Sequence, residues 1–186
     1  ASNQISLNLE DGATTTAVTV NGGDTDTLSN IENVTATQGA DTITGNSENN
    51  TLVGESGNDT LQGEGGVDAL YGDSINGVGT GNDTVTYAYE TTKSVTIDLD
   101  AGTGYIDAND NDTLNSIENA IGGSIGDSIT GSNVANILEG ANGNDTFFSS
   151  DGDDQIYGGA VSAGTHTDNG VDTADYSSGN KILVDL

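Results

Sequence analysis

The sequence predicts an all-β fold, a parallel β-roll (a β-solenoid) built from 18-residue coils. Three observations point to it. Glycine, an oxygen-bearing residue and an apolar residue each recur every nine residues, proline is absent, and no apolar run has helical length. A fixed short period is typical of solenoids, in which each repeat packs against its neighbours. We therefore expect short strands between turns and essentially no helix.

The nine-residue period is clearest in the first half of the chain. Its oxygen-bearing residues are Asp41, Asn50, Asp59 and Asp68, each two residues before Ile43, Leu52, Leu61 or Leu70. The period returns with Asp127, Asn136, Asp145 and Asp154. Each period fits a glycine-containing turn of about six residues and a short strand. Two periods form one coil, so we expect Ile43 and Leu61 to stack on one sheet, and Val34, Leu52 and Leu70 on the other.

A longer repeat lies over the short one. The sequence at 26–33, Asp-Thr-Leu-Ser-Asn-Ile-Glu-Asn, aligns with 112–119, Asp-Thr-Leu-Asn-Ser-Ile-Glu-Asn, at a shift of 86. This predicts a first unit over residues 1–87 and a second over 88–186 that includes the start of a third. The sequence is compatible with one continuous solenoid and with two rolls that have a hinge near 88–110.

The nine-residue period is interrupted twice. After Gly72 the expected ligand position holds Gly77, and Asp83 follows six residues late. After Gly158 that position holds Ala163, and Asp172 follows nine residues late. We interpret 74–79 and 160–170 as loops that bulge from the coil, so that Asp83 and Asp172 close their rows.

Charge and composition exclude several function classes. Thirty Asp and Glu against two Lys and Arg give a formal net charge of -28, which repels nucleic acid and anionic lipid, so we expect neither nucleic-acid binding nor membrane insertion. Cysteine is absent, so no disulfide stabilises the fold. The N-terminal residues lack the layout of a secretory signal. We expect a segment of a larger polypeptide whose neighbouring domains are partners.

Apolar stacking alone does not account for folding. Burying one Leu or Ile contributes about 1.5–3 kcal/mol, whereas ordering nine residues costs on the order of 9–18 kcal/mol in backbone entropy. Carboxylates that stack in rows also repel one another. A multivalent cation between coils would turn this repulsion into a cross-link. Because the ligands are oxygens, with no thiol and a single imidazole, His166, the ion that fits is Ca²⁺, in several copies.

Three segments carry a family resemblance. They are Gly54-Glu-Ser-Gly-Asn-Asp-Thr-Leu-Gln62, Gly63-Glu-Gly-Gly-Val-Asp-Ala-Leu-Tyr71 and Gly140-Ala-Asn-Gly-Asn-Asp-Thr-Phe-Phe148. They resemble the G-G-x-G-x-D-x-U-x repeat of RTX (repeats-in-toxin) proteins. Clear repeats cover residues 39–73 and 122–159. The resemblance implies a β-roll in which turns of alternate repeats clasp Ca²⁺ through the sixth-position Asp and turn carbonyls.

The resemblance also implies particular ligands. The implied pairs are Asp41 with Asp59, Asn50 with Asp68, Asp127 with Asp145, and Asn136 with Asp154. The implied turn ligands are Gly54, Ser56, Gly57, Gly63, Gly65, Gly140, Asn142 and Gly143. Asn50 and Asn136 replace the sixth-position Asp, which removes charge and should weaken their sites.

Two further features leave alternatives open. Glu32 and Glu118 lie 18 residues before Asn50 and Asn136, so each either caps a ligand row or is a solvated glutamate at a strand end. Residues 107–118 have the oxygen spacing of an EF-hand loop, but Asp112 stands where its glycine belongs and no amphipathic helix flanks it. The alternatives for 107–118 are an EF-hand, an irregular calcium site and an acidic loop.

No catalytic constellation is present, and we expect the segment not to be an enzyme. His166 lies in a Ser/Gly/Thr-rich stretch, and Lys93 and Lys181 have no nucleotide-binding motif nearby. The resemblance implies a calcium-binding structural module of a type I-secreted protein, which folds on Ca²⁺ outside the cell or at the bacterial cell surface. We expect a large adhesin as the parent. Carbohydrate binding of the alginate type, with a surface glycan as partner, and ice binding are the alternatives.

Overall fold

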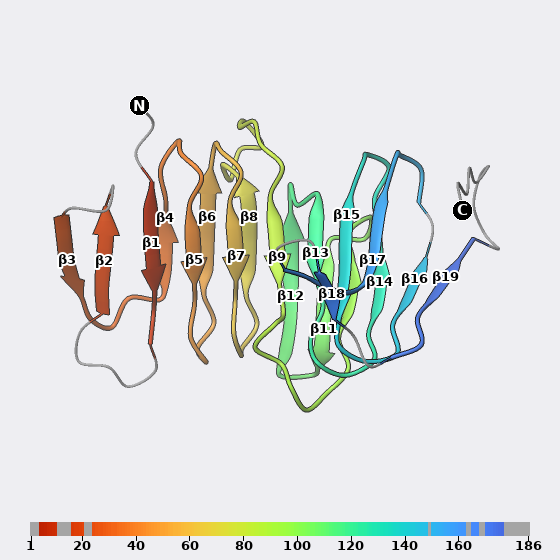
Figure 1. Cartoon of the computed structure of the whole chain (residues 1–186). Helices are drawn as coiled ribbons and strands as arrows, with labels where there is room; N and C mark the ends of the chain where they lie inside the picture. Colours follow the sequence, from red (N-terminus) through yellow and green to blue (C-terminus); the bar gives the residue numbers. More distant parts are fainter. Residues whose placement is uncertain are drawn as a thin grey trace.

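The chain folds into two facing β-sheets that run along the length of the molecule. The computed structural model describes residues 4–10, 16–20, 24–148, 150–162, 165–167 and 170–176. Strands early in the sequence lie at one end and late strands at the other (Figure 1). The residues described contain no helix, as expected, and hence none that could cross a membrane. The all-β prediction is confirmed.

The first sheet has ten strands within the described residues. In spatial order they are β3 (Asp24–Leu28), β2 (Thr16–Val20), β1 (Ile5–Asn8), β5 (Thr42–Thr44), β7 (Thr60–Gln62), β9 (Thr84–Thr86), β13 (Asn119–Ile121), β15 (Ile137–Ala141), β17 (Gln155–Ser162) and β18 (Thr165–Thr167). From β1 to β17 every pair of neighbours is parallel.

The second sheet has nine strands in the described part of the chain. In order they are β4 (Asn33–Thr35), β6 (Thr51–Glu55), β8 (Ala69–Asp73), β12 (Asp110–Asn115), β11 (Thr103–Asp107), β10 (Thr96–Asp98), β14 (Ser128–Thr130), β16 (Thr146–Phe148) and β19 (Thr173–Asp175). Its neighbours are parallel except around β11, which is antiparallel to both β10 and β12.

The register confirms the 18-residue coil. Ile43 is opposite Leu61 in the first sheet, and Leu52 lies between Val34 and Leu70 in the second. Apolar residues 18 apart therefore stack along each sheet, because successive strands of one sheet belong to alternate nine-residue periods.

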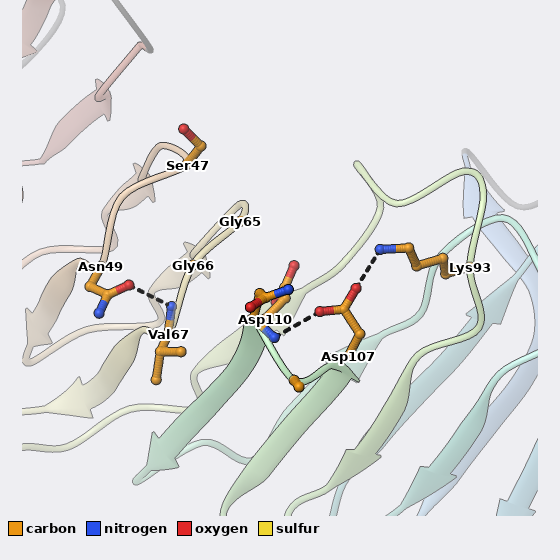
Figure 2. Close-up of a pocket in the computed structure, with 10 residues that line it drawn as sticks. Ser47, Asn49, Gly65, Gly66, Val67, Lys93, Asp107 and Asp110 are labelled. Atoms are coloured by element: carbon orange, nitrogen blue, oxygen red, sulfur yellow. Dashed lines mark hydrogen bonds and ion pairs between the residues drawn. The ribbon is translucent and has the colours of Figure 1, made fainter.

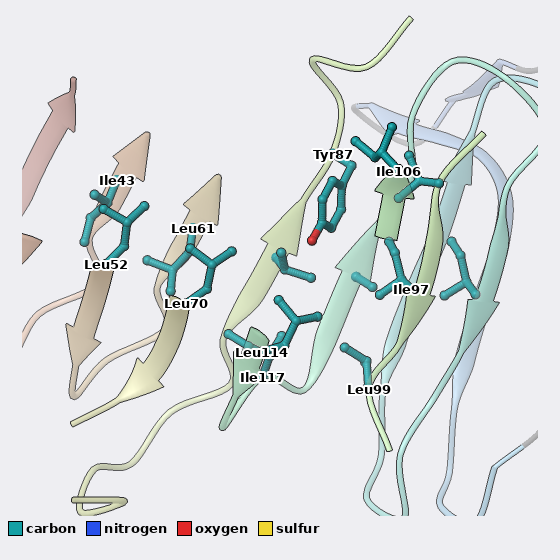
Figure 3. Close-up of a cluster of buried hydrophobic side chains, with 14 of the residues drawn as sticks. Ile43, Leu52, Leu61, Leu70, Tyr87, Ile97, Leu99, Ile106, Leu114 and Ile117 are labelled. Atoms are coloured by element: carbon teal, nitrogen blue, oxygen red, sulfur yellow. The ribbon is translucent and has the colours of Figure 1, made fainter. Parts of the chain in front are cut away.

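The core is the narrow space between the two sheets. Ile43 and Leu61 of the first sheet face Leu52 and Leu70 of the second, and all four are fully buried (Figure 3). Tyr87 fills the core beyond them and is 1% exposed. Its hydroxyl lies over Gly104, where an added Cβ would be 1.7 Å from Tyr87 Oη. The apolar row of the first sheet continues past the interruption through Val85 and Ala120, and Tyr87 adds a bulky ring to the core there.

Three antiparallel insertions depart from the predicted regular roll. At the N-terminal end, β1, β2 and β3 form a meander. Residues 107–118, considered as an EF-hand, form part of the β11–β12 hairpin and the turn after it, so the EF-hand alternative is wrong. The prediction of a loop over 160–170 is also wrong, since Ala160–Ser162 pairs with β18. Residues 74–79 do lie outside the strands, as predicted.

Strand pairing continues across residue 87. β9 pairs with β13 in the first sheet, and β8 pairs with β12 in the second. The predicted third unit at 181–186, including Lys181, lies outside the described residues. Where the chain is described, both sheets connect its two halves.

The stacked core makes a direct prediction for Leu61, which is fully buried between Ile43 and Val85. Leu61→Ala removes apolar contacts and leaves a cavity, so we expect the free energy of unfolding in calcium-containing buffer to fall by about 2–5 kcal/mol. Denaturant titration measures it. Ile75→Ala, at a side chain 60% exposed, is the control and should change stability by less than about 0.5 kcal/mol. Equal losses would contradict the core assignment.

Candidate metal centre

Oxygen-bearing side chains line up in two rows at the turns that lead into the strands. The first polar row leads into the first sheet and consists of Asp41, Asp59, Asp83, Glu118, Asn136 and Asp154. The second polar row lies along the second sheet in two runs separated by β11 and β10, the first of Asn50, Asp68 and Asp112 and the second of Asp127, Asp145 and Asp172. Most of these side chains are buried, because the turns fold inward over them.

Backbone hydrogen bonds link members of each row. In the first row, the Asp41 amide donates to Asp59 Oδ1 at 2.7 Å, and the Asp59 amide to Asp83 Oδ1 at 2.8 Å. In the second, the Asn50 amide donates to Asp68 Oδ1 at 2.8 Å. The Asp127–Asp145 and Asn136–Asp154 links have the same form, at 2.7 and 3.0 Å. The four pairs implied by the resemblance are thus neighbours in the fold.

In one class of turn, the backbone of the turn itself donates a hydrogen bond to a side-chain oxygen of its row residue. We name these the closed turns. In each, the amide four residues before donates to the side-chain oxygen, from Thr37 to Asp41 Oδ2 at 2.8 Å and from Gly123 to Asp127 Oδ2 at 2.6 Å. In the Asn50 and Asn136 turns, the amide four residues before donates to the single side-chain oxygen, Oδ1, at 2.8 and 2.7 Å. A side-chain oxygen engaged by a backbone N–H is less available to a cation.

The second class, the open turns, has a different backbone. The residue four positions before the row residue has a positive φ angle, which is +79° at Glu55, +67° at Glu64 and +72° at Ala141. The glycine two residues later is also positive in each open turn, at +137°, +117° and +120° for Gly57, Gly66 and Gly143. Positive φ at a residue with a side chain is uncommon and costs free energy, so a compensating interaction is expected. The open turns are 54–59, 63–68 and 140–145, and each lies within one of the three segments that carry the family resemblance.

Two open turns leave a carboxylate oxygen buried and without a hydrogen-bond partner. These atoms are Asp59 Oδ2 and Asp68 Oδ2, on side chains only 1% and 2% exposed. Burial raises the pKa of Asp59 to about 6 and of Asp68 to about 8, and neighbouring carboxylates add to both shifts. Desolvated carboxylates without a counter-charge are costly, so these oxygens require a proton or a cation.

A backbone carbonyl of the next coil lies near Asp59 Oδ2. A Cβ built on Gly54 would lie 2.3 Å from Asp59 Oδ2 and 2.6 Å from the carbonyl oxygen of Gly72 in the next coil. Only a glycine leaves this space open. Carboxylate and carbonyl oxygens are the donor set that Ca²⁺ takes in proteins, so the residues present fit the ion.

Acidic side chains alone do not make these sites. No group of three or more His, Asp or Glu side chains is positioned to hold a metal among the residues described. A cation at an open turn would be held by one or two carboxylates together with backbone carbonyls. Residues such as Glu55 and Gly72 would then contribute main-chain oxygens.

The structure also places the remaining predicted residues. Asp83 and Asp172 join the rows beyond the interruptions, where each accepts a hydrogen bond from the preceding row residue at 2.8 and 3.0 Å. Glu118 Oε2 accepts from the Asp83 amide at 2.9 Å, so Glu118 joins the first row between Asp83 and Asn136. The residues after the two glutamates behave alike, since Asn33 Oδ1 accepts from the Thr51 amide and Asn119 Oδ1 from the Ile137 amide. The cap role of Glu32 stays a prediction.

Sequence reasoning missed Asp112 as a row member. Asp112 Oδ1 accepts from the Asp68 amide at 3.0 Å, and Tyr87 Oη donates to Asp112 Oδ2 at 2.7 Å. The tyrosine hydroxyl thus satisfies the second oxygen. A signal was present, because Asp112 stands two residues before Leu114 as every sixth-position Asp stands before its apolar residue.

Asp110 lies beside the second open turn and was also missed. Figure 2 shows it near Gly65 and Gly66, with Lys93 paired to Asp107 at 2.6 Å alongside. Asp110 Oδ1 is buried without a hydrogen-bond partner, and burial followed by the charge of Asp112 raises the pKa of Asp110 to about 6. No spacing rule would have found it, because the β11–β12 hairpin lies outside the nine-residue period.

Comparison with known proteins gives one family. A family model described as RTX calcium-binding nonapeptide repeat (4 copies) matches residues 26–49, 44–74 and 130–161. All three open turns lie within the matched residues. No curated protein sequence matches the chain.

The open-turn geometry predicts a specific sensitivity at Gly57. Its φ is +137°, and an added Cβ would lie 2.5 Å from the carbonyl oxygen of Gly39 in the preceding coil. Gly57→Ala combines backbone strain, on the order of 1–3 kcal/mol, with this backbone clash. The control is Gly77→Ala, where φ is +66° but nothing lies within 4 Å. Thermal unfolding with calcium should show the larger loss for Gly57→Ala, and a smaller loss there would refute the turn assignment.

Proposed function

We propose that this chain, which carries RTX calcium-binding nonapeptide repeats, is a calcium-stabilised structural segment of a large secreted adhesin. Repeats of this family are calcium-binding structural modules of secreted proteins, and the matched residues include the three open turns. The observation that carries the proposal is the buried Oδ2 atoms of Asp59 and Asp68, which lack hydrogen-bond partners in turns whose backbone is itself strained.

The charge of the chain supports folding that depends on calcium. With a formal net charge of -28, the compact state brings many carboxylates together, and burial raises the pKa of Asp59, Asp68 and Asp83. Bound Ca²⁺ supplies a divalent positive charge and takes six to eight oxygen ligands. At about 1 mM calcium, a site with a dissociation constant of ~10⁻⁴ M adds roughly 1.4 kcal/mol to stability. Several such sites would decide whether the roll folds.

Dependence on calcium would determine where the segment folds. In a cytoplasm poor in free calcium it would stay unfolded and fit for type I secretion, and it would fold at the calcium level outside the cell. A continuous, strand-paired roll suits a spacer between the other domains of an adhesin. The division into units at 1–87 and 88–186 stays part of this proposal.

Cell-surface exposure can be tested directly. An antibody raised against the folded segment should label intact cells that express the full-length parent, and labelling should fall when EDTA removes calcium. Labelling seen only after lysis would contradict secretion, although calcium binding by the purified segment would be unaffected.

The open turns predict which substitutions weaken calcium binding. Asp59→Asn and Asp68→Asn each remove one charge from an open turn and should raise the calcium midpoint of folding on the order of tenfold, because ligand charge sets affinity. Circular dichroism during calcium titration measures the midpoint. Asp100→Asn removes the same charge at an exposed position and should leave the midpoint unchanged. If all three variants matched the wild type, the open turns would not be the calcium sites.

A further inference from the structure

The segment that follows Gly72 interrupts the repeats and brings an additional carboxylate to the first open turn. Asp73 ends strand β8, and the chain then leaves the sheet until Asp83 resumes the first polar row. The family repeat has glycine at the position of Asp73, the second residue of its nonapeptide, and so no side-chain ligand there. Its place in the fold therefore needs its own explanation.

Two oxygens in this region are buried and lack hydrogen-bond partners. One is Asp73 Oδ1, and the other is Asp59 Oδ2, on a side chain that is 99% buried. Asp73 is paired with Glu55 of the first open turn across the second sheet, so it lies beside the turn that holds Asp59. Neither Asp59 nor Asp73 has a basic partner, since the ion pair found in the described part of the chain joins Lys93 and Asp107.

Backbone oxygens complete the surroundings. A Cβ built on Gly79 would lie 2.0 Å from Asp73 Oδ1 and 2.5 Å from the carbonyl oxygen of Glu55. The corresponding point at Gly54 lies between Asp59 Oδ2 and the carbonyl oxygen of Gly72. Asp73 Oδ1 thus lies close to the carbonyl oxygen of Glu55, and Asp59 Oδ2 lies close to that of Gly72, where strand pairing places Glu55 opposite Asp73.

We propose that Asp73 is a calcium ligand in a site that differs from the regular repeat sites. The other ligands of this site are Asp59 and the carbonyl oxygens of Glu55 and Gly72. This inference rests on the proposed calcium function and extends it to a residue outside the repeat pattern. The interruption is then a means of closing the last regular site of the first repeat block, because no regular turn follows to close it.

The same site lies against the segment that begins the next block. Gly72 packs on Ser116, whose carbonyl oxygen would lie 2.0 Å from an added Cβ. The Asp83 amide donates to Glu118 Oε2, and the Asp83 carbonyl accepts from the amides of Glu118 and Asn119 at 3.1 and 2.8 Å. Calcium bound by Asp59 and Asp73 would therefore order Asp83 and hold residues 116–119 in place. The site is a calcium-dependent joint between residues 39–73 and the chain after residue 110.

The number of calcium ions bound tests the proposal. Equilibrium dialysis and calorimetry with CaCl₂ would compare the wild type with Asp73→Asn and with Asp100→Asn, the exposed control of equal charge change. We expect Asp73→Asn to lose one calcium ion or to weaken one site at least about tenfold, and Asp100→Asn to match the wild type. A second pair of variants tests the same site without changing any charge. Gly79→Ala should lose the same site, and Gly77→Ala, with no neighbour within 4 Å, should keep it.

Hydrogen exchange tests the joint. Peptides covering 72–83 and 116–122 should become protected together as calcium rises, and Asp73→Asn should shift both to higher calcium while peptides within 136–148 keep the wild-type response. Unchanged stoichiometry and protection in Asp73→Asn would overturn the proposal. So would loss of every site in that variant, which would make Asp73 a general folding residue. A wild type that binds no calcium would instead refute the proposed function itself.

Discussion

The constraint on which this structure depends is the stacking of carboxylates. An 18-residue coil returns the chain to the same place, so any acidic residue in the period forms a row with its neighbours. The fold meets part of this cost with backbone amides, as when the Asp41 amide donates to Asp59 Oδ1. The turns differ in whether the remaining carboxylate oxygen also accepts a backbone hydrogen bond.

Closed and open turns solve this second problem in different ways. A closed turn bends its own amide onto the free oxygen, as Thr37 does for Asp41. An open turn places residues such as Glu55 at positive φ, which turns the amide away and leaves the oxygen of Asp59 buried. Strained backbone and an unsatisfied carboxylate in one turn are unfavourable unless an ion binds there. The rows therefore combine closed turns, whose side-chain oxygens are hydrogen-bonded, with open turns, whose geometry suits a bound cation.

Much of the regular architecture could be predicted from the sequence. Ile43 opposite Leu61 and Leu52 opposite Leu70 follow from the nine-residue period alone, because the coil length sets both the register and the core. The β11–β12 and β17–β18 hairpins could not be predicted, since their pairing has no period. Asp112 carried a local signal before Leu114, whereas Asp73 carried none and is brought to Asp59 only by the folded chain. That these residues bind calcium stays a prediction.

The measurement that tests this account most directly is far-UV circular dichroism of EDTA-stripped protein titrated with CaCl₂, with MgCl₂ as the control. The account predicts a cooperative transition from coil to β-structure at about 0.1–1 mM calcium and none with magnesium at the same concentration, because metal binding and folding are coupled. Stripped protein that is already fully β and does not respond to calcium would contradict the central claim that the open turns need an ion.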